Sequence, residues 1–147
     1  RLAACRALAA MKSEARDAVP AVIELLNDKD DKVRWNAART LGLIGPPASQ
    51  AIPALVAALH DPDADVREHS AESIGQIGTH DARAIAALTA ALQDRSPKVR
   101  RDAVRSLGQL GPAAKPARKE IAARTKDESE NVRKAATTAL HQVDPPK

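Results

Sequence analysis

One segment of this chain recurs along its length at a fixed spacing of 33 residues. The stretch from Val33 to Gly45 returns from Val66 to Gly78 and from Val99 to Gly111, and more loosely from Val132 to Val143. An earlier half-copy, residues 1–8, lies in the same register. A fixed period of this size is typical of a solenoid, in which each unit buries its apolar face only against its neighbours. The repeat therefore constrains the architecture more than any other feature.

Each unit is expected to contain two helices. The first has apolar residues at the i, i+3, i+4, i+7 spacing of an amphipathic helix, as at Val19, Val22, Ile23 and Leu26. Pro20 and Pro53 recur inside this pattern, where they mark either a helix start or a kink. The second helix begins after a capping residue: Asp30 or Asp31, Asp63, Ser96 and Ser129. It ends at a glycine expected in the αL conformation: Gly45, Gly78 and Gly111.

The sequence predicts an all-α fold, a right-handed α-solenoid of stacked antiparallel helix pairs with about four and a half repeats of 33 residues. The predicted units are a half repeat at 1–12 and full repeats at 13–45, 46–78, 79–111 and 112–147. The last unit is expected to be a cap, because polar residues replace apolar first-helix positions at Arg118, Arg124 and Thr125.

The first unit is expected to be truncated, because Arg1 lies in the middle of a repeat. A targeting segment, if the full protein has one upstream, would then be missing from this sequence. A half repeat also leaves Leu2 and Leu8 without their own first helix, which invites end-to-end self-association. Cys5 aligns with Ala38, Ala71 and Val104 and is expected to be a small buried thiol.

Three columns of identical residues recur in the repeats. Glycine inside the last helical turn costs roughly 1 kcal/mol relative to alanine, so Gly42, Gly75 and Gly108 predict close approach of an adjacent helix. The other two columns are charged, and each charge opposes the helix dipole at its position. They are Asp28, Asp61, Asp94 and Asp127, and Arg1, Arg34, Arg67, Arg100 and Arg133. We expect these columns to form an Asp–Arg ladder between the repeat turns, in preference to a binding role for the arginines.

The pattern resembles the HEAT repeat, in the short variety first noted in phycobilisome lyases. The matching residues are the Asp before the turn, the Val-Arg pair that opens the second helix, Ala37-Ala38 and the segment Leu41–Gly45. The resemblance covers essentially the whole chain and is specific for the fold, whereas such repeats serve unrelated functions. It implies that the second helices line the concave surface.

Outward positions on the second helices provide the candidate partner-binding residues. They are Trp35, Arg39, Glu68, His69, Glu72, Arg101 and Arg105. Trp35 is the single tryptophan and is a candidate interface anchor, or alternatively a cover for the incomplete N-terminal repeat. The charged residues alternate in sign between repeats, and they could instead pair as Arg39–Glu72–Arg105 and Glu68–Arg101.

The leading functional hypothesis is a non-enzymatic scaffold that binds a protein partner on its concave surface. An alternative is a regulatory or accessory module of a larger enzyme. A nucleic-acid partner is disfavoured, because the acidic residues interrupt the continuous positive surface that tracks phosphates. The net charge of +4 permits an acidic partner without requiring one. No segment is apolar enough to span a membrane.

The sequence predicts neither a metal nor another cofactor. His69 and Glu72 have the i, i+3 spacing that can hold a metal ion. Some HEAT-like enzymes, such as deoxyhypusine hydroxylase, carry His-Glu dyads on several repeats. Here the order is Glu68-His69, and it occurs in a single copy. A di-iron site needs carboxylates and histidines that converge from several helices.

Overall fold

The computed structural model describes residues 1–146, apart from the side chains at positions 6, 9 and 12–14. The described elements are all helical, and after α1 the first and second helices alternate along the chain. The α-helices are α1 (Leu2–Met11), α2 (Val19–Leu25), α3 (Asp31–Ile44), α4 (Ile52–Ala58), α5 (Ala64–Ile77), α6 (Ala82–Ala91), α7 (Pro97–Leu110), α8 (Arg118–Ala123) and α9 (Glu130–Val143). Short 3₁₀ helices cover Lys12–Ala18, Pro46–Ala51, Gly111–Ala117 and Arg124–Lys126.

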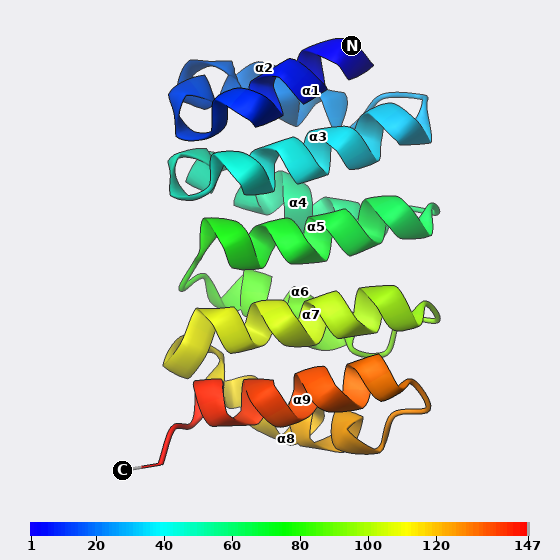
Figure 1. Cartoon of the computed structure of the whole chain (residues 1–147), viewed down its shortest axis with the longest axis vertical. Coiled ribbons are helices and arrows are strands. Elements are labelled where there is room, and N and C mark those ends of the chain that lie inside the picture. Colours follow the sequence, from blue (N-terminus) through cyan, green and yellow to red (C-terminus); the bar gives the residue numbers. More distant parts are fainter. Residues whose placement is uncertain (147) are drawn as a thin grey trace.

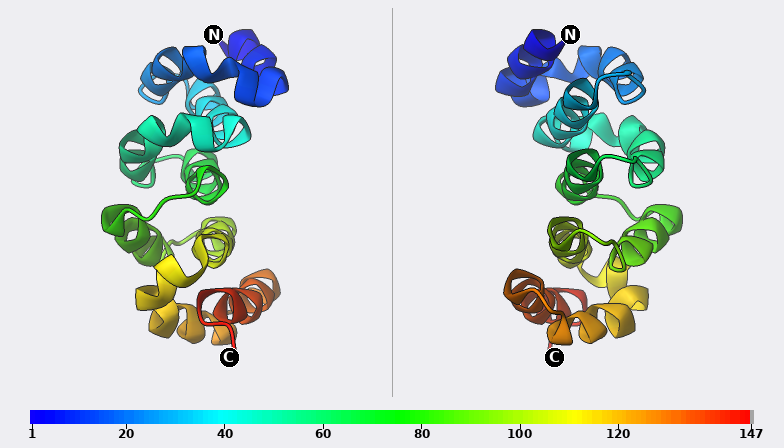
Figure 2. Two further views of the ribbon diagram at one scale, coloured as in Figure 1. Left: turned by 90° about the vertical axis from the view of Figure 1, so that its left-hand side faces the viewer. Right: turned by 90° about the vertical axis from the view of Figure 1, so that its right-hand side faces the viewer.

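The helices stack in two layers along one axis, which confirms the predicted all-α solenoid (Figure 1). The second helices α1, α3, α5, α7 and α9 form one layer, and the first helices α2, α4, α6 and α8 form the other. Side views show that the stack is a shallow arc with the second-helix layer on its inner side (Figure 2). The second helices therefore present the concave surface of the molecule.

Proline marks the start of two of the first helices, α2 and α4. Pro20 and Pro53 occupy the opening positions of α2 and α4, and each helix follows directly on a 3₁₀ helix. Proline is tolerated there because the first N–H groups of a helix have no intrahelical acceptor. The chain thus reaches the helix through a tight turn, and neither proline lies in a helix interior.

The ends of the second helices differ in part from expectation. Asp30 and Asp63 cap α3 and α5 by accepting the N–H groups of Lys32 at 2.9 Å and Asp65 at 3.0 Å. Ser96 and Ser129 occupy the N-cap positions of α7 and α9, but neither hydroxyl makes a capping hydrogen bond. Their own backbone N–H groups donate instead to ladder carboxylates, those of Asp94 and Asp127, at 2.8 and 2.9 Å.

The terminal glycines have positive φ but are not in the αL conformation. Gly45 has φ 76° and ψ −145°, Gly78 has φ 77° and ψ 136°, and Gly111 has φ 61° and ψ −139°. This combination is essentially restricted to glycine. An extended ψ sends the chain away from the helix axis and toward the first helix of the next repeat, whereas an αL residue would curl it back over the helix end.

The core lies between the two layers and consists of aliphatic side chains. Leu41, Leu55, Ile74, Leu88 and Leu107 are fully buried. Cys5 is also fully buried, and burial raises the pKa of its thiol. Because no large aromatic side chain separates the layers, the helices can approach closely and each repeat packs only on its neighbours.

The second helices touch one another at the internal glycines, as predicted. A Cβ atom on Gly42 would lie 2.5 Å from Ser73 Oγ, and one on Gly75 would lie 2.8 Å from the Cα atom of Ser106. The same contact is reinforced by hydroxyl groups that reach back to the preceding helix. Ser73 donates to the carbonyl of Ala38 at 2.8 Å, and Ser106 donates to that of Ala71 at 2.7 Å.

Candidate functional site

The two charged columns meet at the loop edge of the solenoid, where they join one repeat to the next. Arg34 donates from Nε and Nη2 to the carboxylate of Asp61, which lies 27 residues later, at 2.8 and 3.0 Å. Its remaining nitrogen, Nη1, donates to the carbonyl of Asp28 at 2.9 Å, at the end of the helix in its own repeat. Each guanidinium therefore holds three segments of the chain together.

The same arrangement recurs in the later repeats. Arg67 binds Asp94 with bonds of 2.7 and 3.0 Å, and Arg100 binds Asp127 with two bonds of 2.9 Å. The Arg100 and Asp127 side chains are 7% and 2% exposed. The hydrogen bonds from Arg100 hold the pKa of Asp127 below its usual range, and those from Asp127 raise the pKa of Arg100. Both groups therefore remain charged in the folded protein.

The ends of the ladder are more open. Arg1 contacts Asp28 at 2.6 Å, and its side chain is 56% exposed. Arg133 donates to the carbonyls of Asp127 at 2.8 Å and Glu128 at 3.0 Å. The guanidinium groups of the ladder are thus engaged within the chain and lie beside the turns.

Trp35, His69 and Glu72 form one cluster across two repeats of the concave face. The rings of Trp35 on α3 and His69 on α5 stack with their centroids 5.1 Å apart and an interplanar angle of 26°. His69 Nδ1 lies 3.3 Å from Glu72 Oε2, and this hydrogen bond holds the pKa of Glu72 below its usual value. The indole therefore packs on the following repeat, whereas the alternative from sequence placed it over the N-terminal half repeat.

The remaining candidate charges form a second cluster between α5 and α7. Arg101 Nη2 contacts Glu68 at 3.1 Å and Asp102 at 2.7 Å, so Glu68 and Arg101 do come together across repeats. Burial, followed by the nearby Asp102 carboxylate, raises the pKa of Glu68. Arg105 lies 3.6 Å from Asp102. The chain Arg39–Glu72–Arg105 is not formed among the described ion pairs, because Glu72 binds His69 and Arg105 lies beside Asp102.

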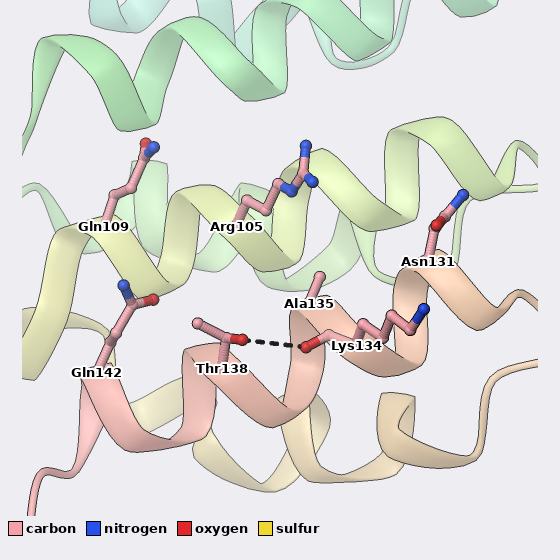
Figure 3. A pocket seen from close by; sticks show the side chains of 7 residues that line it. All are labelled: Arg105, Gln109, Asn131, Lys134, Ala135, Thr138 and Gln142. Carbon is pink, nitrogen blue, oxygen red and sulfur yellow. Dashed lines mark hydrogen bonds between the residues drawn. The ribbon is translucent and has the colours of Figure 1, made fainter.

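A hollow of about 470 Å³ lies between α7 and α9 on the same face (Figure 3). Its lining residues are Arg105, Gln109, Asn131, Lys134, Ala135, Thr138 and Gln142. Of these, only Arg105 is among the residues singled out from sequence. Some of the others could have been found from the sequence, because they occupy equivalent outward positions on successive second helices. Gln142 follows Gln109 by one repeat, and Lys134 follows Arg101 by one repeat. Their arrangement into a hollow depends on the angle between α7 and α9, which the repeat pattern does not specify.

The described side chains do not form a metal cluster. Leaving aside positions 6, 9, 12–14 and 147, no group of three or more His, Cys, Asp or Glu side chains could hold a metal ion. His69 and Glu72 approach each other, but no third ligand of these types completes a site there. Among the described helices, none is long and apolar enough to cross a membrane.

Comparison with known protein families decides the identity of the repeat. The family described as HEAT repeats matches this chain at residues 1–51, 47–95 and 85–147, which together span it. The chain belongs to the HEAT repeat family. No curated protein matches this chain.

Solved structures share the fold of this HEAT solenoid. A chain from the complex of CpcE and CpcF of phycocyanin lyase from Nostoc sp. PCC7120 is 28% identical, with a TM-score of 0.76 over 88% of this chain and 54% of that chain. Human deoxyhypusine hydroxylase is 28% identical, with a TM-score of 0.66 over 85% of this chain and 43% of that chain. A designed armadillo repeat protein in complex with the peptide (KR)4 is 19% identical, with a TM-score of 0.76 over 97% and 74%. This chain therefore spans about half the length of the lyase chain.

Proposed function

We propose that this HEAT solenoid is a non-enzymatic scaffold that binds a protein partner on its second-helix face. The proposal rests on the position of polar side chains that take no part in the Asp–Arg ladder. Arg39, Glu72 and Arg105 project from successive second helices, and these helices line the inner side of the arc. A concave surface built from several repeats is the geometry that solenoids use for binding.

The rigidity of the stack supports this role. Each repeat is fixed to the next by an Arg–Asp pair with two hydrogen bonds, as at Arg67 and Asp94. Serine-to-carbonyl bonds and glycine contacts hold the second helices at the same time, as at Ser106 and Gly75. A surface that is already ordered loses less conformational entropy when it binds, so more of the contact free energy appears as affinity.

The phycocyanin lyase relative supports a protein partner. That HEAT-type chain was solved in a complex of CpcE with CpcF. From that structure we transfer to this chain only the class of ligand, another protein, because this chain spans 54% of the lyase chain. The same partial coverage favours a second role, in which the solenoid is an accessory module of a larger enzyme and contacts another part of the same polypeptide.

Site-specific photo-crosslinking in an extract of the source cells tests the proposal. A benzoylphenylalanine at position 39 of α3 samples the concave face, and one at position 57 of α4 samples an exposed point on the opposite layer. We expect protein adducts from position 39 that are absent from position 57. Identical adducts from both positions, or none from position 39, would contradict the proposed face.

A Trp35→Ala variant carrying the crosslinker at position 39 tests the anchor. If the indole contacts the partner, the adduct from position 39 should fall severalfold, because aromatic side chains at interfaces contribute large apolar contact. An unchanged yield would show that Trp35 serves only the stack with His69.

A further inference from the structure

The hollow between α7 and α9 has a distinctive chemistry within the second-helix face. Its lining combines two cationic side chains, Arg105 and Lys134, with three carboxamides and one hydroxyl, and it contains no carboxylate. Figure 3 shows Arg105 and Gln109 extending from α7 away from α9 and toward the preceding second helix, while Gln142 extends from α9 toward α7. Its volume of about 470 Å³ lies in the range of ligand sites, roughly 300–1,000 Å³.

The two cations are available for a ligand. Arg105 is 62% exposed, and its nearest carboxylate, Asp102 at 3.6 Å, is already held by two hydrogen bonds from Arg101. Lys134 is 73% exposed and pairs with Glu130 one helical turn away, where both groups are in water. An exposed pair of this kind is weak and exchanges readily with a competing carboxylate.

Two of the three carboxamides lie beside internal glycines of the preceding second helix. The oxygen of Gln109 lies over Gly75, 2.4 Å from where a Cβ would stand, and that of Gln142 lies over Gly108, at 2.2 Å. Both side chains are exposed, so their amide groups are open to a ligand. Carboxamide NH₂ groups are donors that suit peptide carbonyls.

We propose that this hollow binds an extended acidic segment of the protein partner, with an Asp or Glu side chain between Arg105 and Lys134. The inference rests on the proposed function and names the class of partner sequence. Arginine binds carboxylate through parallel hydrogen bonds, and the neighbouring amides hold the peptide backbone. Glu68 and Glu72 on α5 would repel an acidic segment, so we expect it to bind only at the α7–α9 end of the face. The same carboxylates disfavour a long polyanion such as nucleic acid, which would extend over α5.

Titration of the whole chain with synthetic peptides tests this inference. The probes are fluorescein-labelled (Glu-Ser)4, (Gln-Ser)4 and (Lys-Ser)4, with backbone amide NMR shifts used to locate binding. The variant Arg105→Glu/Lys134→Glu reverses both cations of the hollow. The control Lys119→Glu/Lys29→Glu makes the same change in net charge at exposed positions on α8 and in the loop before α3.

We expect (Glu-Ser)4 to shift amide signals of α7 and α9, and its dissociation constant to rise at least tenfold in the hollow variant but less than twofold in the control. Equal losses in both variants would overturn the inference, since they would indicate binding to net charge alone. Absence of (Glu-Ser)4 binding, or equal binding of (Gln-Ser)4, would overturn it as well.

The inference and the proposed function fail separately. Crosslinking at position 39 depends on α3 and uses none of the residues that line the hollow. Adducts from position 39 without acidic-peptide binding would overturn the hollow and keep the concave scaffold. Binding of (Lys-Ser)4 with shifts of α5 signals, without binding of (Glu-Ser)4, would likewise overturn the acidic-segment inference and leave the concave scaffold in place.

Discussion

At the scale of single residues, the internal glycines set the distance between repeats. Gly75 faces the backbone of Ser106 on the next second helix, and a Cβ there would lie 2.8 Å from its Cα atom. A Cβ on Gly108 would lie 3.1 Å from Ala139 and 2.2 Å from Gln142 Oε1, but the latter is the end of a flexible, exposed side chain that can move aside. Both glycines can be replaced by alanine without a change of charge, which makes them a matched pair.

We expect Gly75→Ala to destabilise the fold by about 1–3 kcal/mol through overpacking, although alanine alone would favour the helix by about 1 kcal/mol. Gly108→Ala should be milder, because the gain in helix propensity offsets a smaller clash. Urea denaturation followed by circular dichroism measures both. A Gly75→Ala variant as stable as the original chain would contradict the close contact.

The stack of Trp35 on His69 makes a prediction for tryptophan fluorescence. The imidazole stacks on the indole with ring centroids 5.1 Å apart, so it forms part of the surroundings of this single tryptophan. We expect His69→Gln to change the emission spectrum of Trp35, whereas His80→Gln, in an exposed loop, should leave it unchanged. An unchanged spectrum in His69→Gln would place the imidazole elsewhere.

At the scale of the helices, the Arg–Asp pairs connect elements that are distant in sequence. Arg67 on α5 binds Asp94, which follows α6, and so links two repeats. Both side chains are largely buried, and removing one partner leaves the other charge without compensation. The exposed pair of Lys134 and Glu130 on α9 is the natural comparison, since both of its side chains are in water.

We expect Arg67→Met to cost on the order of 3 kcal/mol of unfolding free energy, as for a broken buried pair. Lys134→Met should cost well under about 1 kcal/mol, as for a surface pair. Equilibrium urea unfolding of the two variants provides the comparison. Equal costs would mean that burial does not determine the contribution of the ladder.

The ladder also predicts a dependence of stability on acid. Arg100 lowers the pKa of Asp127 in the folded protein relative to the unfolded chain, where an aspartate has a pKa of about 3.9. Its contribution is therefore fully present above that value and is lost as the pH falls through the lower, folded pKa. Asp127→Asn should be less stable at pH 5 and should change less between pH 5 and pH 2.5. Asp17→Asn makes the same side-chain change at an exposed position outside the ladder and serves as the control.

At the scale of the whole molecule, the period of the sequence determines most of the architecture. The second helices, the glycine contacts and the helix starts at Pro20 and Pro53 all follow from a pattern that repeats every 33 residues. Such features depend on local chemistry and on packing between equivalent positions. They are therefore visible in one sequence without any knowledge of the angle between repeats.

Features that depend on the exact placement of one repeat on the next could not be predicted. The sequence does not indicate that Trp35 reaches His69, nor that Ser73 reaches the carbonyl of Ala38, because each contact crosses between repeats. The ψ angles of the terminal glycines and the absence of a capping bond from the Ser96 hydroxyl are likewise not apparent from the repeat pattern. The hollow between α7 and α9 belongs to the same class.

The most direct test of the scaffold compares the two faces with one matched change. Arg39→Glu alters the concave face at α3, and Ala57→Glu places a carboxylate on the opposite layer at α4. Isothermal titration with the partner captured from position 39 should show at least a tenfold loss of affinity for Arg39→Glu, equivalent to about 1.4 kcal/mol, and less than a twofold loss for Ala57→Glu. A larger loss for Ala57→Glu, or an undiminished affinity for Arg39→Glu, would contradict a scaffold that binds through its second helices.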